Sequence, residues 1–122
     1  MVEVITTDEF AGWFRGLDAK EQASVALGVE RLQALGVSLG FPHSSSIKGA
    51  TLALRELRIQ SGGKPLRVFY AFDPRRDAVL IIGGDKTGDE RFYERMVPLA
   101  ESIFTEYLRE QAAGLHDQED EP

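Results

Sequence analysis

The chain has 122 residues, a length that predicts one domain with a hydrophobic core of its own. It carries a formal net charge of −6, no cysteine and two distant histidines, which excludes disulfides and thiolate metal sites and argues against a zinc centre. The first ten residues lack the pattern of a signal peptide, and no segment reaches the ~20 apolar residues of a membrane span. We therefore expect a cytoplasmic protein that does not associate with membranes.

The N-terminal part of the chain predicts a strand followed by two helices. Residues 2–5 form a short β-branched run, and Thr6 precedes Glu9 with the spacing of a capping box. Asp18 and Glu21 repeat that spacing, and Gly36 is the expected stop of the second helix. The two helices show apolar faces at Phe10, Trp13, Phe14 and Leu17, and at Val25, Val29, Leu32 and Leu35. They should pack as a helical hairpin.

The middle of the chain predicts an antiparallel β-meander. Residues 37–51 form a loop rich in glycine, proline and serine. Three strands follow at residues 52–60, 66–72 and 78–82, joined by turns at residues 61–64 and 73–77. The third strand is apolar at every position, which predicts that both of its faces are covered.

The C-terminal part predicts one helix and an acidic tail. Thr87 and Glu90 have capping-box spacing, and the apolar face comprises Phe92, Met96, Leu99, Ile103 and Tyr107. Pro98 lies inside this pattern and should break or kink the helix. Residues 115–122 are acidic and predicted to be disordered, so the single domain spans residues 1–114. Segregated helices and strands of this kind indicate an α+β fold.

The charge is unevenly distributed, and its basic part coincides with the meander. Residues 48–95 hold ten basic and seven acidic side chains, whereas residues 96–122 hold one basic and seven acidic. The candidate cations are Lys48, Arg55, Arg58, Lys64, Arg67 and Lys86. One hypothesis is an RNA-backbone site, because guanidinium groups bind phosphates and stabilise charge on a phosphoryl group under attack. The other is a set of solvated strand positions in ordinary ion pairs.

Other candidates are few. Tyr93 falls off the buried helical stripe, so it is free to stack on a base or transfer a proton, whereas Tyr70 fits a core position. His43, in the polar loop, is either a general base or simply solvated. Residues 83–88 lack the spacing of a nucleotide-binding P-loop. The aspartates of the turns are explained by turn and capping preferences, so we expect no metal site.

Three motifs resemble a known family: LRELR at residues 54–58, LRVFYAFD at 66–73 and GGDKTGDERFYE at 83–94. Together they are similar to the RelE/HigB superfamily of toxins from bacterial toxin–antitoxin pairs, most closely its phage-derived HigB-like branch. The resemblance implies a RelE-like fold and a ribosome-dependent messenger-RNA endoribonuclease that needs no metal or other cofactor. In such enzymes the ribose 2′-hydroxyl attacks the adjacent phosphate, leaving a 2′,3′-cyclic phosphate and a 5′-hydroxyl.

The resemblance also assigns residues. Arg67 matches a strand arginine that stabilises the transition state, Lys86 a basic residue at the end of the last strand, and Tyr93 a tyrosine of the C-terminal segment. We therefore predict Arg67, Lys86 and Tyr93 as catalytic, converging on one patch. The RNA-binding set is Lys48, Arg55, Arg58 and Lys64. Glu56 departs from the pattern, because active members of the RelE branch carry a lysine there; Arg55, Lys48 or His43 are the candidate substitutes.

The resemblance further implies a cognate antitoxin, often a helix-turn-helix protein, and leaves a homodimer open. Two alternatives to an RNA-cutting toxin remain. One is a ParE-like inhibitor of DNA gyrase, which needs no RNA site. The other is a binding or regulatory module that keeps the fold without activity, which Glu56 and the acidic net charge motivate.

Overall fold

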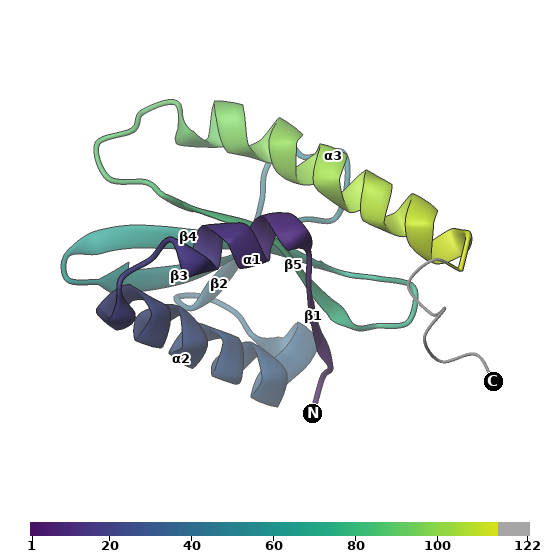
Figure 1. Cartoon of the computed structure of the whole chain (residues 1–122), viewed down its shortest axis with the longest axis horizontal. Coiled ribbons are helices and arrows are strands. Elements are labelled where there is room, and N and C mark those ends of the chain that lie inside the picture. Colours follow the sequence, from purple (N-terminus) through teal and green to yellow (C-terminus); the bar gives the residue numbers. More distant parts are fainter. Residues whose placement is uncertain (115–122) are drawn as a thin grey trace.

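A computed structural model describes residues 1–114 and shows a five-stranded sheet with strand order β1-β5-β4-β3-β2 and helices packed against it (Figure 1). Its elements are β1 (Val4–Thr6), α1 (Asp8–Arg15), α2 (Ala19–Leu35), the 3₁₀ turn η1 (Gly36–Ser38), β2 (Ser44–Ser46), β3 (Arg55–Ser61), β4 (Lys64–Phe72), β5 (Ala78–Asp85) and α3 (Phe92–Ala112). Strands β3, β4 and β5 form the predicted antiparallel meander, and β1 joins its far edge parallel to β5. The α+β fold is confirmed. The acidic tail predicted to be disordered lies outside the described residues.

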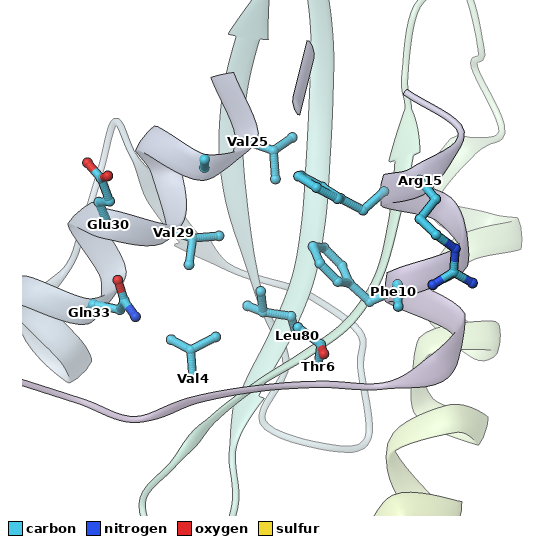
Figure 2. A pocket seen from close by; sticks show the side chains of 12 residues that line it. Val4, Thr6, Phe10, Arg15, Val25, Val29, Glu30, Gln33 and Leu80 are labelled. Atoms are coloured by element: carbon cyan, nitrogen blue, oxygen red, sulfur yellow. The ribbon is translucent and has the colours of Figure 1, made fainter. Parts of the chain in front are cut away.

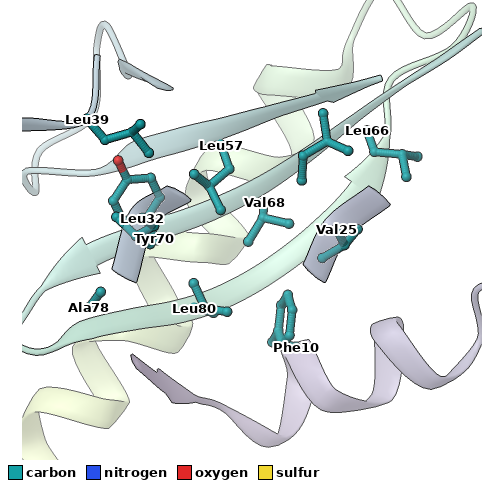
Figure 3. Close-up of a cluster of buried hydrophobic side chains, with 11 residues drawn as sticks. Phe10, Val25, Leu32, Leu39, Leu57, Leu66, Val68, Tyr70, Ala78 and Leu80 are labelled. Atoms are coloured by element: carbon teal, nitrogen blue, oxygen red, sulfur yellow. The ribbon is translucent and has the colours of Figure 1, made fainter. Parts of the chain in front are cut away.

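The sheet is covered on both faces, and each face has its own core. On the first face α1 and α2 pack onto the sheet through Phe10, Val25, Leu32, Leu57, Val68, Tyr70 and Leu80 (Figure 3). On the second face α3 packs through Phe69, Ala71, Val79, Ile81, Phe92, Met96, Ala100 and Ile103. Because β5 contributes to both clusters, its unbroken apolar run is explained by burial on both sides.

Two consecutive glycines near the end of β5 let aromatic rings approach the sheet from opposite sides. A Cβ atom on Gly83 would lie 2.3 Å from the Trp13 ring of α1, and one on Gly84 would lie 2.8 Å from the Phe92 ring of α3. Successive strand residues face opposite sides, so each ring needs its own glycine. The Phe92 contact sets where α3 begins, and it thereby brings Tyr93 close to the sheet.

Some local predictions differ from the structure. The capping residue of α1 is Thr7, not Thr6: the Thr7 hydroxyl accepts from the Phe10 amide at 3.0 Å and donates to the Ile81 carbonyl at 2.6 Å. The Asp18–Glu21 capping box is present as predicted. Thr87 does not cap a helix, because its amide and hydroxyl both donate to Asp85 and α3 begins only at Phe92.

Helix α3 is continuous through Pro98, so the predicted break is absent. Pro98 lies on the exposed side of the helix, where water can satisfy the carbonyl that loses its intrahelical hydrogen bond. Buried side chains on both sides of it, Met96 and Ala100, hold the helix to the sheet. In the part of the chain that the structure describes, no helix combines the length and apolar character needed to cross a membrane.

Candidate functional site

An open hollow of about 560 Å³ lies on the side of the sheet that α3 covers. Four segments meet there: β2 with the residues after it, β3, the end of β5 and the first turn of α3. Its walls are formed by Ser45, Ser46, Ile47, Lys48, Glu56, Arg58, Lys86 and Tyr93. Of the residues predicted from the sequence, the fold thus brings Lys48, Arg58, Lys86 and Tyr93 together in one place.

The floor of this hollow is the carboxylate of Glu56, a side chain that is only 5% exposed. Its Oε1 accepts the hydroxyl of Tyr93 at 2.6 Å, and its Oε2 accepts the hydroxyl of Ser45 at 2.9 Å. Two guanidinium groups lie nearby, with Arg67 Nε at 3.4 Å from Oε1 and Arg58 Nη1 at 3.6 Å from Oε2. A buried carboxylate needs such compensation, because desolvating an unpaired charge is very costly.

Arg67 lies beneath the hollow, and its side chain is almost completely covered. It is 4% exposed and pairs in the sheet with Arg58, so both side chains belong to the same face. Its Nη1 donates to the Leu66 carbonyl at 3.0 Å, whereas its buried Nε makes no hydrogen bond despite the nearby Glu56 carboxylate. In this arrangement Glu56 occupies the position at which an external anion would meet Arg67.

Tyr93 and Lys86 are in contact with each other at the rim. The ammonium of Lys86 lies 5.7 Å from the centre of the Tyr93 ring, a cation–π distance. The ring packs edge-on against Phe69 and Phe92. Burial, and then the hydrogen bond to Glu56, raise the pKa of the Tyr93 phenol above its ordinary value, so the group is a protonated hydrogen-bond donor at neutral pH.

Arg55 and Lys64 lie away from the hollow. Strand alternation turns Arg55 to the opposite face, where its Nε donates to the Ser44 hydroxyl at 3.2 Å and the Tyr70 hydroxyl at 3.3 Å. Tyr70 is a fully buried core residue, as predicted. Lys64 lies at the tip of the β3–β4 hairpin and binds Glu21 at 3.1 Å, a contact that raises the pKa of the lysine. Both cations therefore make structural contacts in this fold.

Sequence reasoning missed two parts of this site. The run of serines was interpreted as loop, although Ser44–Ser46 forms the edge strand β2 and Ser45 pairs with Glu56. Glu56 was regarded as a lost lysine, whereas it is the group around which Tyr93, Ser45 and Arg67 are arranged. The shared face of Glu56 and Arg58 was readable from the period of two, but the strand register that adds Arg67 to that face, and the contacts among the three side chains, were not.

A separate groove of about 510 Å³ lies between α1, α2 and β1 (Figure 2). Its lining is mostly apolar and includes Val4, Phe10, Phe14, Val25, Val29 and Leu80, with Arg15 and Glu30 at its rim. Such a groove offers hydrophobic contact rather than acid–base chemistry. Within residues 1–114, no three or more histidine, aspartate or glutamate side chains gather in a way that could hold a metal ion.

The fold is that of the RelE-like toxins. A solved structure of E. coli toxin RelE, a double arginine-to-alanine mutant in the free state, superposes with a TM-score of 0.56. The match covers 78% of this chain and 94% of the RelE chain at 10% sequence identity. At that identity the likeness concerns the fold alone.

Sequence comparisons identify the family within this class. The model of the family described as phage derived protein Gp49-like (DUF891) matches residues 12–105. A Mycobacterium tuberculosis H37Rv protein named "Putative toxin HigB3" is 33% identical over 113 residues, covering 91% of this chain and 97% of that protein. Another from the same strain, "Putative toxin HigB2", is 31% identical over 83% of this chain and 52% of its own length. The chain therefore belongs to the Gp49-like family, within the RelE/HigB superfamily of toxins from toxin–antitoxin systems.

Proposed function

We propose that this chain is a toxin that cleaves messenger RNA on the ribosome, without a metal or other cofactor. The observation that carries the proposal is the gathering of Lys48, Arg58, Lys86 and Tyr93 in one hollow of a protein whose net charge is −6. Cations clustered on an otherwise acidic chain form a local site for an RNA backbone, since phosphate contacts supply most of the affinity for nucleic acids.

The reaction that fits this site is an internal transfer of the phosphoryl group. The 2′-oxygen of a ribose attacks the adjacent phosphorus, the bond from phosphorus to the 5′-oxygen breaks, and the products are a 2′,3′-cyclic phosphate and a 5′-hydroxyl. The proton leaves the 2′-oxygen, and the 5′-oxygen takes one up. Lys48 and Lys86 hold the flanking phosphates, and Arg67 stabilises the charge that develops on the phosphoryl oxygens.

The buried contact between Glu56 and Arg67 sets a condition on this proposal. For Arg67 to reach the phosphate, the RNA must take the place of the Glu56 carboxylate. Tyr93 then donates its hydrogen bond to a phosphate oxygen instead of to Glu56. A dianionic transition state competes for these donors better than a single carboxylate does, which is a form of differential binding of the transition state.

The proposal includes a cognate antitoxin, of the helix-turn-helix kind, that keeps the toxin inactive in the cytoplasm, and it leaves a homodimer open. The relatives named as HigB toxins support the existence of such a partner. Among the features of this chain, the apolar groove between α1 and α2 is a surface on which a protein partner could be tested for binding.

The test is to express the chain from a tightly controlled promoter and to map RNA 5′ ends after induction. We expect growth arrest with new 5′-hydroxyl ends inside translated messages, and loss of both in Arg67→Ala. The matched control is Arg15→Ala, which removes an exposed guanidinium from α1, on the opposite face of the sheet. Arrest without message cleavage would contradict the proposal and favour a gyrase inhibitor.

The Glu56–Arg67 contact itself favours one second candidate, a binding module that keeps the fold without cutting RNA. In that case the carboxylate permanently neutralises the arginine that catalysis requires. Expression of the chain alone would then cause no arrest, and Glu56→Gln would not create any message cleavage.

A further inference from the structure

We infer that the RNA site extends beyond the first hollow into a second one, in which Arg31 and His43, with Phe41 beside them, hold the neighbouring nucleotide of a single-stranded RNA. The inference rests on the proposed function, because it concerns the continuation of the same RNA strand. It adds Arg31, Phe41 and His43, which lie outside all three sequence motifs.

The second hollow, of about 470 Å³, lies at the edge of β3 between α2 and the loop that precedes β2. Its position follows from Gly28, where the absence of a side chain lets α2 approach Ile59 of β3; a Cβ at Gly28 would lie 3.2 Å from that side chain. Ser24 and Arg31, which line the hollow, lie four residues before and three residues after Gly28, so they share its face of the helix. The close approach therefore turns Arg31 toward the sheet edge.

The lining of this hollow is basic. Its residues include Arg31, Arg58, Arg67 and His43 and no aspartate or glutamate. Glu56 pairs with Arg58 and Arg67 from the side of the first hollow, but Arg31 makes no ion pair within the described part of the chain. A phosphate group supplies an acceptor for the Arg31 guanidinium, which has no carboxylate beside it in this lining.

An exposed aromatic ring lies next to this basic lining. Phe41 is 78% exposed, precedes the lining residues Pro42 and His43, and has the Arg58 guanidinium at 5.4 Å from its ring centre. The Phe41 ring is therefore accessible to a ligand that lies along the basic lining. Bases of single-stranded RNA stack on such rings, and a basic groove beside an aromatic platform is the usual arrangement for this ligand.

Arg58 joins the two hollows, because it is a lining residue of both. A single RNA strand therefore passes from Lys48 and Lys86, over Arg58, to Arg31 and Phe41. It follows that a dinucleotide fills only the first hollow, whereas a longer RNA reaches the second. Substitution of Arg31 or Phe41 should accordingly weaken the binding of the longer RNA but not that of the dinucleotide.

The experiment measures the binding of fluorescent, 2′-O-methylated RNAs to the purified full chain by fluorescence anisotropy, at several salt concentrations. The 2′-O-methyl group prevents cleavage, so binding is measured without the reaction. The probes are a dinucleotide and an oligonucleotide several residues longer. The variants are Arg31→Ala and Phe41→Ala, with Phe41→Trp as the conservative replacement and Arg15→Ala as the matched control. Both tested side chains are exposed, and thermal melting verifies that each variant is folded.

We expect Arg31→Ala to lower the affinity for the longer RNA about tenfold. The slope of log affinity against log salt concentration should become shallower by about 0.7, the value for one lost phosphate contact on a single strand. Phe41→Ala should also lower the affinity for the longer RNA about tenfold, and Phe41→Trp should retain that affinity. The dinucleotide should bind equally to all of these proteins.

Equal binding of the longer RNA by wild type, Arg31→Ala and Phe41→Ala would overturn the second subsite. So would a wild-type chain that binds neither probe. The mapping of message ends decides the proposed function independently, since it measures cleavage by the wild type and Arg67→Ala and does not involve Arg31 or Phe41.

Discussion

The hydroxyl of Tyr93 donates to Oε1 of Glu56 at 2.6 Å, and this bond joins the first turn of α3 to the beginning of β3. The same oxygen lies 3.4 Å from Nε of Arg67. One carboxylate thus engages two of the three residues predicted to be catalytic. The free protein is therefore in a closed arrangement, in which the two groups are paired internally before any RNA arrives.

Tyr93→Phe should preserve the fold and reduce activity. The ring contacts with Phe69 and Phe92 remain, while Glu56 keeps its other partners, so we expect a loss of about 1–2 kcal/mol in the free energy of unfolding. Urea denaturation measures this. Message cleavage should fall at least tenfold, because the donor to the phosphate is gone. Full activity in a folded Tyr93→Phe protein would remove Tyr93 from the catalytic set.

Glu56 and Arg67 should show strong coupling in a double-mutant cycle. Glu56→Leu and Arg67→Met, the two single variants of the cycle, each leave one buried charge without its partner, so we expect each to lose about 3–5 kcal/mol in stability. The double variant Glu56→Leu with Arg67→Met removes both charges and should recover most of that loss. Unfolding in urea gives the four free energies, and additive losses would mean that the two side chains do not compensate each other.

Glu101 should attach the loop before β3 to α3 in a pH-dependent manner. Its Oε2 accepts from the Thr51 amide at 2.6 Å, the Thr51 hydroxyl at 2.5 Å and the Leu52 amide at 3.1 Å. These hydrogen bonds, first that of the Thr51 side chain, lower the pKa of the Glu101 carboxyl below its usual 4.5. A lowered pKa in the folded state means stability that is present above the unfolded-state pKa and is lost as pH falls through the folded value.

The melting temperature of Glu101→Gln should accordingly lie below that of the wild type at about pH 7, and this difference should narrow as the pH falls below 4.5. Glu30→Gln, an exposed substitution on α2 outside the first helical turn, is the control and should leave the melting temperature unchanged in neutral and in acid solution. A difference in melting temperature between wild type and Glu101→Gln that persists unchanged in acid would show that the Glu101 charge is not what holds the loop.

Gly83→Ala should destabilise the protein through the Trp13 ring. The added Cβ would lie 2.3 Å from that ring, so α1 must shift, at a cost of about 1–3 kcal/mol or more. Since Trp13 is the single tryptophan of the chain, its fluorescence reports the shift directly. Gly12→Ala is the matched control: it is exposed in the same helix, with only a side-chain atom at 3.9 Å, and should stabilise by about 1 kcal/mol.

Much of the secondary structure could be predicted because its signals are local. The Asp18–Glu21 capping box and the apolar stripe of α2 involve residues within a few positions of each other. The same holds for the turns that separate β3, β4 and β5. The cap of α1 was misplaced by one residue because two threonines are adjacent, and only the contacts of Thr7 with Phe10 and Ile81 distinguish them.

The candidate site was predicted in part. Strand alternation puts Arg55 and Arg58 on opposite faces of β3, although both were predicted to bind RNA, and only the pairing of β3 with β4 puts Arg67 on the face of Arg58. It could not reveal that Arg55 is engaged by Ser44 and Tyr70, or that Lys64 pairs with Glu21. These contacts depend on which helix covers which face, and no periodicity within one strand contains that information.

The sequence by itself determined the kinds of elements, their order, the family and the concentration of cations in the meander, because propensity, capping and periodicity act over short stretches of chain. Only the tertiary structure decided what those cations contact. Glu56, Arg67 and Tyr93 belong to three different elements, and their common site exists because the pairing of β3 with β4 and the packing of Phe92 on Gly84 bring them together. Burial then makes their partnership obligatory, since a charge removed from water must be compensated by whatever the fold places beside it.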